Sequence, residues 1–188
     1  MVDLSMHLMD IVQNSIRAEA KNIRVDFWED NDENTLTFSV KDDGCGMSRE
    51  TLTKLSDPFF TTRTTRKVGL GVPFLKMTSE QTGGFLEVKS EKNHGTEIKA
   101  VYRTDNPDCL PLGDLAGYIA LLLAANKEIS FTFRYQLGDN AFELNTNELA
   151  EQGITEFQNA EILAAIKEYI AENLKELFSE RKKESFLC

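Results

Sequence analysis

A glycine-rich turn, Asp42-Asp43-Gly44-Cys45-Gly46, follows directly on a strand of alternating character and constrains the fold more than any other segment. Leu36, Phe38 and Val40 share one face of that strand, which predicts a sheet with one buried face. The glycines at alternate positions let the backbone bend sharply and approach a flat ligand closely. The aspartate at the strand end can accept a hydrogen bond from an exocyclic amine. Taken alone, the turn is also compatible with an ordinary hairpin or an incomplete calcium loop.

The first predicted helix, residues 4–20, is apolar around much of its circumference and carries one narrow polar stripe. The stripe consists of His7, Asp10, Asn14 and Arg17 at spacings of three and four. Such a helix should lie largely buried, and each unpaired buried polar group costs about 1–3 kcal/mol. A ligand or a metal ion would supply the missing partners. The alternative is a solvated helix edge with a contact between Asp10 and Asn14.

A loop rich in Thr, Arg and Gly, residues 57–71, precedes a second helix that we expect to begin near Val72. The loop carries Arg63 and Lys67, and it ends in Gly69-Leu70-Gly71. A glycine turn at a helix N-terminus favours anions, because backbone N–H groups and the helix dipole point at them. No G-x-x-x-x-G-K-[ST] sequence occurs, so this is not a P-loop. The alternative is a solvated basic loop.

The order of these segments is more specific than any one of them. The helix with Asp10 and Asn14, the Asp42 turn, the sequence PFFTTR…GLG and Gly95-Thr96-Glu97-Ile98 resemble the four boxes of the GHKL family. This family groups gyrase, heat-shock chaperone, histidine kinase and mismatch-repair ATPases. The resemblance covers residues 1–103. It implies an α/β fold of the α+β two-layer sandwich type, with a mixed sheet and helices on one face.

The resemblance also implies a site for Mg·ATP. Asn14 would hold Mg²⁺, Asp42 would accept the adenine N6 amine, and Thr96 would support Asp42 or an adenine-bound water. Asp10 would be the catalytic base. The other implied nucleotide-binding residues are Ala18, Gly44, Gly46, Met47, Thr62, Arg63, Lys67, Gly69, Leu70, Gly71 and Val72.

Two features depart from the usual family pattern. The ATPase and protein-kinase branches usually place Glu four residues before the metal-binding Asn, and this chain has Asp10, which is one methylene shorter. The lid from Phe60 to Gly69 is short, closer to histidine kinases than to gyrase or the chaperones. The only histidines are His7 and His94. We expect His7 to be a packing residue and His94 a turn residue, with neither a phosphoacceptor.

The net charge of −10 is unevenly distributed. Residues 105–188 hold 15 acidic and 7 basic side chains, a net charge of −8. This argues against a phosphate backbone, and so nucleic acid, as the main partner. Three distant cysteines, Cys45, Cys109 and Cys188, make a disulfide framework or a zinc site unexpected.

Neither a signal peptide nor a membrane span is predicted. Asp3 and Asp10 stand where a signal peptide needs a basic start and an apolar run. The most apolar stretch, residues 115–125, is far shorter than the roughly 20 residues that a spanning helix requires. We therefore expect a soluble, cytoplasmic protein.

A boundary is predicted at residues 105–108, Asp-Asn-Pro-Asp. It divides an ATP-binding domain, residues 1–104, from a small α/β extension of unknown role, residues 105–188. The extension reads as helix, strand, hairpin and helix. Its aromatic strand, with Phe131, Phe133 and Tyr135, is expected in the sheet core, and a partner surface is the alternative.

Three functions fit these observations. The first is a regulatory ATPase or protein kinase that acts on a protein partner. The second is a non-catalytic binding module, resembling anti-sigma factors, in which ATP gates partner affinity. A third is a nucleotide-driven homodimer like the mismatch-repair proteins, against which the short lid and the acidic C-terminal region count.

Overall fold

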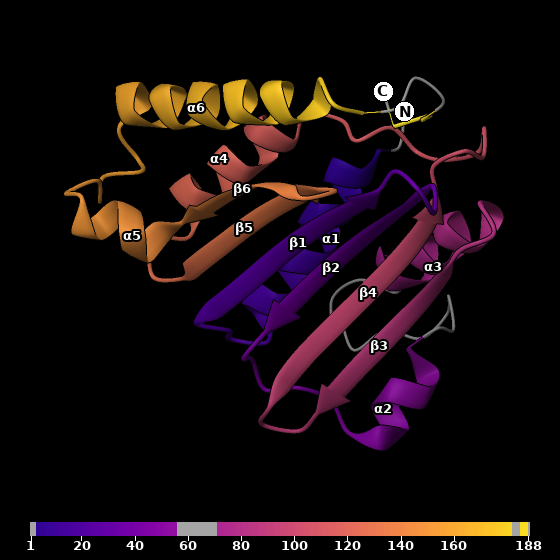
Figure 1. The fold of residues 1–188 in the computed structure, drawn as a ribbon. Helices are drawn as coiled ribbons and strands as arrows, with labels where there is room; N and C mark the ends of the chain where they lie inside the picture. Colours follow the sequence, from indigo (N-terminus) through magenta and orange to yellow (C-terminus); the bar gives the residue numbers. More distant parts are fainter. Residues whose placement is uncertain (1–2, 56–70, 182–184, 188) are drawn as a thin grey trace.

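A computed structural model describes residues 3–55, 71–181 and 185–187 (Figure 1). The described helices are α1 (Leu4–Arg17), α2 (Arg49–Lys54), α3 (Gly71–Gln81), α4 (Leu115–Ala125), α5 (Thr146–Glu151) and α6 (Ala160–Phe178). The described strands are β1 (Asn22–Asp30), β2 (Thr35–Asp42), β3 (Phe85–Glu91), β4 (Gly95–Arg103), β5 (Ser130–Leu137) and β6 (Asn140–Asn145).

The described strands form one sheet in the order β3-β4-β2-β1-β5-β6. Strands β1 and β5 are parallel, and the other neighbours are antiparallel. Helices α1, α3 and α4 lie behind the sheet in Figure 1, and α6 runs beside α4 near the β6 edge. The predicted α+β sandwich, a mixed sheet with helices on one face, is confirmed.

Alternation of side chains decides which face of the sheet the helices cover. Along β1, Ile23, Val25 and Phe27 are buried, and the residues between them are more exposed. The ring of Phe27 stacks on that of Phe38 in β2 at 4.9 Å between centroids. One apolar face per strand therefore packs against the apolar side of α1, as the period-2 pattern predicts.

Helix α1 begins at a cap and ends earlier than expected. The Asp3 carboxylate accepts a hydrogen bond from the Met6 N–H at 2.8 Å, which satisfies one of the free donors of the first turn. The helix ends at Arg17 rather than at Ala20, because Glu19 adopts a φ of 60°. That left-handed residue redirects the chain into β1.

Residues 105–188 continue the same sheet. Strand β5 lies parallel to β1, with Val25 opposite Phe133, and the two parts share one hydrophobic core. Phe131, Phe133 and Tyr135 are buried, so the prediction of a core strand is confirmed. Helix α5, capped by the Asn145 side chain, was not expected from the sequence. The division at residue 104 stays a prediction, because a shared sheet does not decide whether either part folds alone.

A buried polar cluster attaches the end of the chain to β1. The Glu29 side chain, 1% exposed, accepts hydrogen bonds from Arg181 Nε at 2.8 Å and from the Tyr135 hydroxyl at 2.8 Å. The Arg181 guanidinium also lies 4.1 Å from the Phe178 ring centroid and donates to the Leu187 carbonyl. Because the buried charge is paired and hydrogen-bonded, it fixes where the chain after α6 runs.

Candidate nucleotide-binding site

A cavity of about 540 Å³ opens where β2 ends in the glycine turn. Parts of α1, the turn, α2, α3 and the β3–β4 hairpin surround it. The lining residues are Ile11, Asn14, Ser15, Arg17, Ala18, Asp42, Cys45, Gly46, Met47, Ser48, Thr51, Leu55, Val72, Lys92, Asn93, Thr96 and Ile98. This volume and the mixture of apolar walls with a few polar groups suit a small-molecule site.

The Asp42 carboxylate is the most constrained polar group in this cavity. It is 8% exposed, and its Oδ2 accepts a hydrogen bond from the Ser15 hydroxyl at 2.6 Å. Its Oδ1 accepts from the backbone N–H groups of Gly44 at 3.0 Å and Thr96 at 3.2 Å. A carboxylate offers about four acceptor positions, so one remains for a ligand. The site therefore suits a ligand that donates a hydrogen bond, such as an exocyclic amine.

The glycines of the turn are required by close backbone contacts. Gly46 has a φ of 60°, and a Cβ on it would lie 1.9 Å from the Glu91 carbonyl oxygen. A Cβ on Gly44 would lie 2.7 Å from the Ala18 carbonyl oxygen. Any larger residue would push the turn away from its neighbours, which explains the alternate glycines seen in the sequence.

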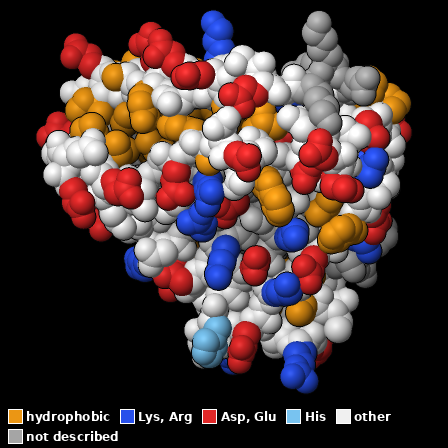
Figure 2. All heavy atoms as spheres, viewed as in Figure 1, with side chains coloured by type: hydrophobic (Ala, Val, Ile, Leu, Met, Phe, Trp, Pro, Cys, Tyr) orange, Lys and Arg blue, Asp and Glu red, His pale blue; other side chains and the backbone are white. Residues whose placement is uncertain are grey.

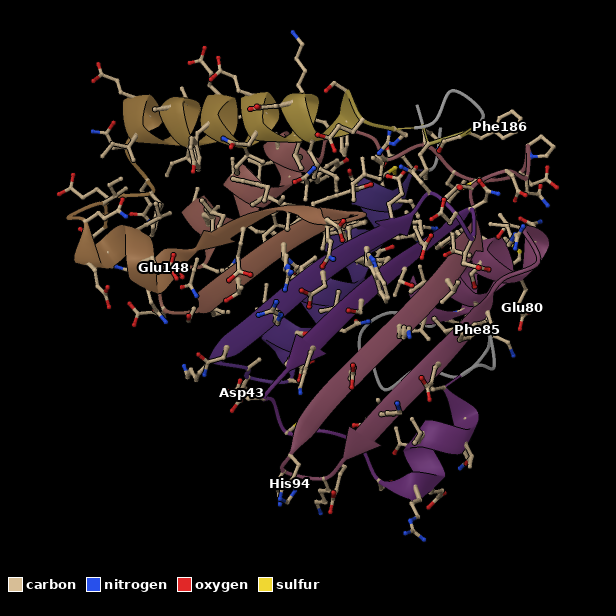
Figure 3. The ribbon with its side chains drawn as sticks, viewed as in Figure 1. Asp43, Glu80, Phe85, His94, Glu148 and Phe186 are labelled. Atoms are coloured by element: carbon tan, nitrogen blue, oxygen red, sulfur yellow. The ribbon has the colours of Figure 1, made fainter. Side chains whose placement is uncertain are left out.

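Two backbone hydrogen bonds hold the turn at its midpoint. The Cys45 N–H donates to the Ala18 carbonyl at 2.8 Å, and the Cys45 carbonyl accepts from the Asn93 N–H at 2.7 Å. These bonds tie the end of α1 to the β3–β4 hairpin through the turn. Figure 3 shows that Asp43 of the turn and His94 of the hairpin lie at the same end of the sheet.

Asp43, next to the cavity, has a structural role. Its carboxylate accepts hydrogen bonds from the backbone N–H groups of Lys21 and Asn22 and from the Asn22 side chain. Desolvation alone would raise the pKa of Asp43, but these hydrogen bonds outweigh it and hold that pKa below its usual value. Asp43 thus stabilises the connection between α1 and β1.

The residues of the polar stripe on α1 lie in different surroundings. Asn14 is half-buried in the cavity wall, and its amide oxygen accepts from Arg17 at 3.4 Å. Asp10 is exposed and does not line the cavity, but a Cβ on Gly71 would lie 3.1 Å from the Asp10 Cβ. The first residue of α3 therefore packs directly against the Asp10 position, and the Asn14 amide oxygen is hydrogen-bonded to Arg17 rather than facing Asp10 alone.

His7 is a packing residue, as expected. It is 3% exposed, and its Nε2 lies 3.3 Å from the Thr78 hydroxyl, which in turn lies 2.9 Å from the Tyr102 hydroxyl. Burial lowers the pKa of His7, although Asp10 and Asp3 act in the opposite direction. The neutral imidazole thus joins α1, α3 and β4.

The structure brings together most of the predicted nucleotide-binding residues that it describes. Those that line the cavity are Asn14, Ala18, Asp42, Gly46, Met47, Val72 and Thr96. Asp10, Gly44 and Gly71 lie next to it, through the contacts described above. The predicted residues Thr62, Arg63, Lys67, Gly69 and Leu70 lie outside the described residues.

The described residues could supply only part of the coordination of a Mg²⁺ ion, with the phosphates of a nucleotide and water supplying the rest. They contain no group of three or more His, Cys, Asp or Glu side chains that could hold a metal ion. Mg²⁺ usually keeps several waters and takes one or two protein oxygens plus phosphates. The Asn14 amide oxygen fits that limited role.

Comparison with known proteins decides the family. The model of the family described as histidine kinase-, DNA gyrase B- and HSP90-like ATPase matches residues 2–106. The chain belongs to this family, the GHKL ATPase family. Membership implies that this domain binds nucleotide.

Several curated relatives of the GHKL domain are sensor or sporulation kinases. A putative sensor protein of Shewanella frigidimarina is 30% identical over 105 residues, 54% of this chain and 16% of that protein. Sensor kinase CckA of Brucella abortus is 40% identical over 65 residues, 34% of this chain and 7% of its own length. Sporulation kinase C of Bacillus subtilis is 30% identical over 98 residues, 52% of this chain and 23% of its own length. The chain thus spans less than a quarter of each of these relatives.

The fold agrees with a solved structure. A crystal structure of the N-terminal domain of a DNA repair protein superposes with a TM-score of 0.54 over 77% of this chain and 52% of the other. At 15% identity, this likeness shows the fold alone. In the part of the GHKL chain that the structure describes, no helix is both long enough and apolar enough to cross a membrane.

Sequence reasoning missed several residues of the GHKL cavity. Ser15 follows Asn14 directly, but only the fold shows that its hydroxyl reaches Asp42. Lys92 and Asn93 belong to a hairpin turn whose residue types are typical of any turn. Cys45, to which no chemistry was assigned, also lines the cavity.

Proposed function

We propose that this chain binds Mg·ATP and acts as a regulatory ATPase or protein kinase that transfers a phosphoryl group to a protein partner. The observation that carries the proposal is the Asp42 carboxylate, which lines the cavity and accepts three hydrogen bonds, leaving about one acceptor position for a ligand. Such a group selects an adenine N6 amine over the carbonyl of guanine. Mg²⁺ and a cytoplasmic location are parts of the proposal.

The chemistry demanded of the protein is limited. Phosphoryl transfer depends mainly on positioning and charge stabilisation. Asn14, in the cavity wall, would hold Mg²⁺ against the phosphates. Helix α3 begins at Gly71, and the N–H groups and dipole of a helix N-terminus favour an anion. Asp10, in contact with that helix end, would orient a water or deprotonate a hydroxyl.

A second candidate is an ATP-gated binding module without turnover, resembling an anti-sigma factor. It is favoured by the position of Asp10, which is exposed and outside the cavity lining. In this case Asp10 would order a water, and ATP occupancy would change the affinity for a protein partner. The names of two relatives, a sensor kinase and a sporulation kinase, support the first candidate, because both match this domain.

Binding and turnover of γ-labelled ATP distinguish the two candidates. We expect the chain to bind ATP and release labelled phosphate or label a partner, and we expect Asp10→Asn to retain binding while turnover falls by about a hundredfold. Glu19→Gln is the control, because Glu19 is an exposed carboxylate just beyond the C-terminal end of α1. Tight, unreacted ATP would establish the binding module instead. Full turnover by Asp10→Asn would refute the role of Asp10 as base.

A further inference from the structure

A second cavity lies in the C-terminal segment, away from the nucleotide site. It measures about 500 Å³ and is bounded by β6, α5 and α6. Its apolar walls include Leu144, Leu149, Ile154, Ile162, Ala165 and Tyr169. None of its lining residues lines the nucleotide cavity. We call this feature the α5–α6 groove.

The groove is open, and aromatic side chains lie along it. Tyr169 is 50% exposed, and its ring meets the buried Phe142 ring edge-on at 5.6 Å between centroids. In Figure 2, hydrophobic side chains gather over the region between α6 and α5 and are bordered by acidic side chains. An exposed apolar patch with a polar rim is typical of a site that binds another molecule.

The rim of the groove is acidic. Glu143 of β6 and Glu148 of α5 line it, and Figure 3 shows Glu148 on α5. On α6, Ala165 lines the groove. Lys167 belongs to another side, since it pairs with Asp114 of α4 at 3.0 Å. No lysine or arginine is found among the described lining residues.

The end of this chain does not fill the groove. Leu187 is 1% exposed, and the Phe186 N–H donates to the Thr104 carbonyl at 2.9 Å. Figure 3 places Phe186 and Glu148 at opposite sides of the molecule. The described C-terminal residues therefore pack near Thr104, away from the groove.

Charge excludes several other occupants. A second copy of this groove would bring one acidic rim against another, and like charges repel. Anionic membranes and nucleic acids are repelled in the same way. The apolar walls and acidic rim of the groove suit a ligand with an apolar stripe flanked by positive charges. An amphipathic helix supplies both, because residues at i, i+3, i+4 and i+7 share one face.

We propose that the α5–α6 groove binds a basic amphipathic helix of a partner protein. Large apolar side chains of that helix enter the groove, and its flanking lysines or arginines face Glu143 and Glu148. This assigns a docking role to residues 105–188. It does not depend on the proposed reaction at the nucleotide site, so the test needs no ATP.

The probe is a fluorescein-labelled helical peptide of leucine and lysine, with leucines at i, i+3, i+4 and i+7. Its anisotropy is followed during titration with the full chain. Ala165→Arg places a cation in the groove, and Ala164→Arg places the same charge on the exposed neighbouring side of α6. We expect Ala165→Arg to weaken binding by about tenfold or more and Ala164→Arg by less than about twofold. Both residues are exposed and arginine favours helix, so both variants should fold.

Three further measurements separate shape from charge. Ala165→Glu obstructs the groove while adding negative charge, and it should also weaken binding. Glu148→Lys should weaken binding and reduce its salt dependence. A peptide with glutamate in place of lysine should bind at least about tenfold more weakly.

Other results would overturn the proposal. Equal weakening by Ala164→Arg and Ala165→Arg would mean that only the net charge attracts the peptide. Binding of anionic vesicles that Ala165→Arg abolishes would assign the groove to a membrane. Self-association of the wild-type chain that Ala165→Arg abolishes would make it an interface between copies.

Discussion

Replacing Asp42 by Asn tests the nucleotide site most directly, because it changes the chemistry of one atom and little of the shape. Asn Oδ1 can still accept the N–H groups of Gly44 and Thr96. The new NH₂ group stands where Oδ2 accepted from Ser15 at 2.6 Å. The Ser15 hydroxyl can rotate and accept instead, since a hydroxyl is both donor and acceptor. The turn should therefore keep its structure.

The expected loss follows from the acceptor position that remains on Oδ2. In Asp42→Asn that position becomes a donor, which opposes the adenine N6 amine. A hydrogen bond to a charged group contributes about 1.5–3 kcal/mol. ATP affinity should therefore fall by at least about tenfold, or 1.4 kcal/mol, and by about a hundredfold if the whole bond is lost. Inosine triphosphate, which has a carbonyl at this position, should lose less affinity than ATP.

Titration calorimetry with ATP and inosine triphosphate measures both affinities. Asp43→Asn is the control, because it removes the same charge from the adjacent residue, which does not line the cavity. Asp43→Asn should lower the melting temperature, since it weakens the bonds to Lys21 and Asn22, and should leave ATP affinity within about twofold. Unchanged ATP affinity in Asp42→Asn would refute the site. An equal loss in both variants would show that the turn, not the carboxylate, had been damaged.

Three more changes test other parts of the structure. Ser15→Ala should weaken ATP binding several-fold in calorimetry, because it removes a neutral hydrogen bond of about 1 kcal/mol that orients Asp42; unchanged affinity would mean that the backbone bonds suffice. Arg181→Met should lower the free energy of unfolding in urea by about 3 kcal/mol, because it leaves the Glu29 carboxylate buried without its partner, and adding Glu29→Gln should recover part of the loss. A full effect in the double variant would contradict this coupling. Burial lowers the pKa of His7 in the folded state below its ordinary 6.5. The contribution of the neutral His7 to folding stability is therefore complete above pH 6.5 and is lost as the pH falls below that value. His7→Gln should flatten this decline in the melting temperature between about pH 6.5 and 5, and an unchanged profile would assign the decline to other groups.

Most of the local structure could be predicted from the sequence. The period of two in β1 and β2 predicted which of their side chains are buried. The polar stripe and the glycine turn indicated Asn14 and Asp42, and the family resemblance implied Thr96; the fold gathers the three in one cavity. These signals are short-range, because repeat period, caps and turn glycines act within a few residues of the chain.

Contacts between distant segments needed the tertiary structure. The hydrogen bond from Ser15 to Asp42 joins residues 27 apart in the chain, and nothing in either segment encodes it. The contacts of Asp10 could not be predicted either, because the helical period shows which residues share a face of the helix but not which other segments pack against that face. The fold puts it against Gly71 and outside the cavity lining.

The C-terminal segment shows this division most clearly. Its sequence predicted an aromatic strand and an amphipathic final helix, and both form. Only the tertiary structure shows that β5 pairs in parallel with β1. It also shows that α5 and α6 leave a groove between them. Alternation within a strand states which face is buried but not which strand lies beside it. The choice of neighbour depends on how all the apolar faces of the chain can be buried together, which no single segment determines.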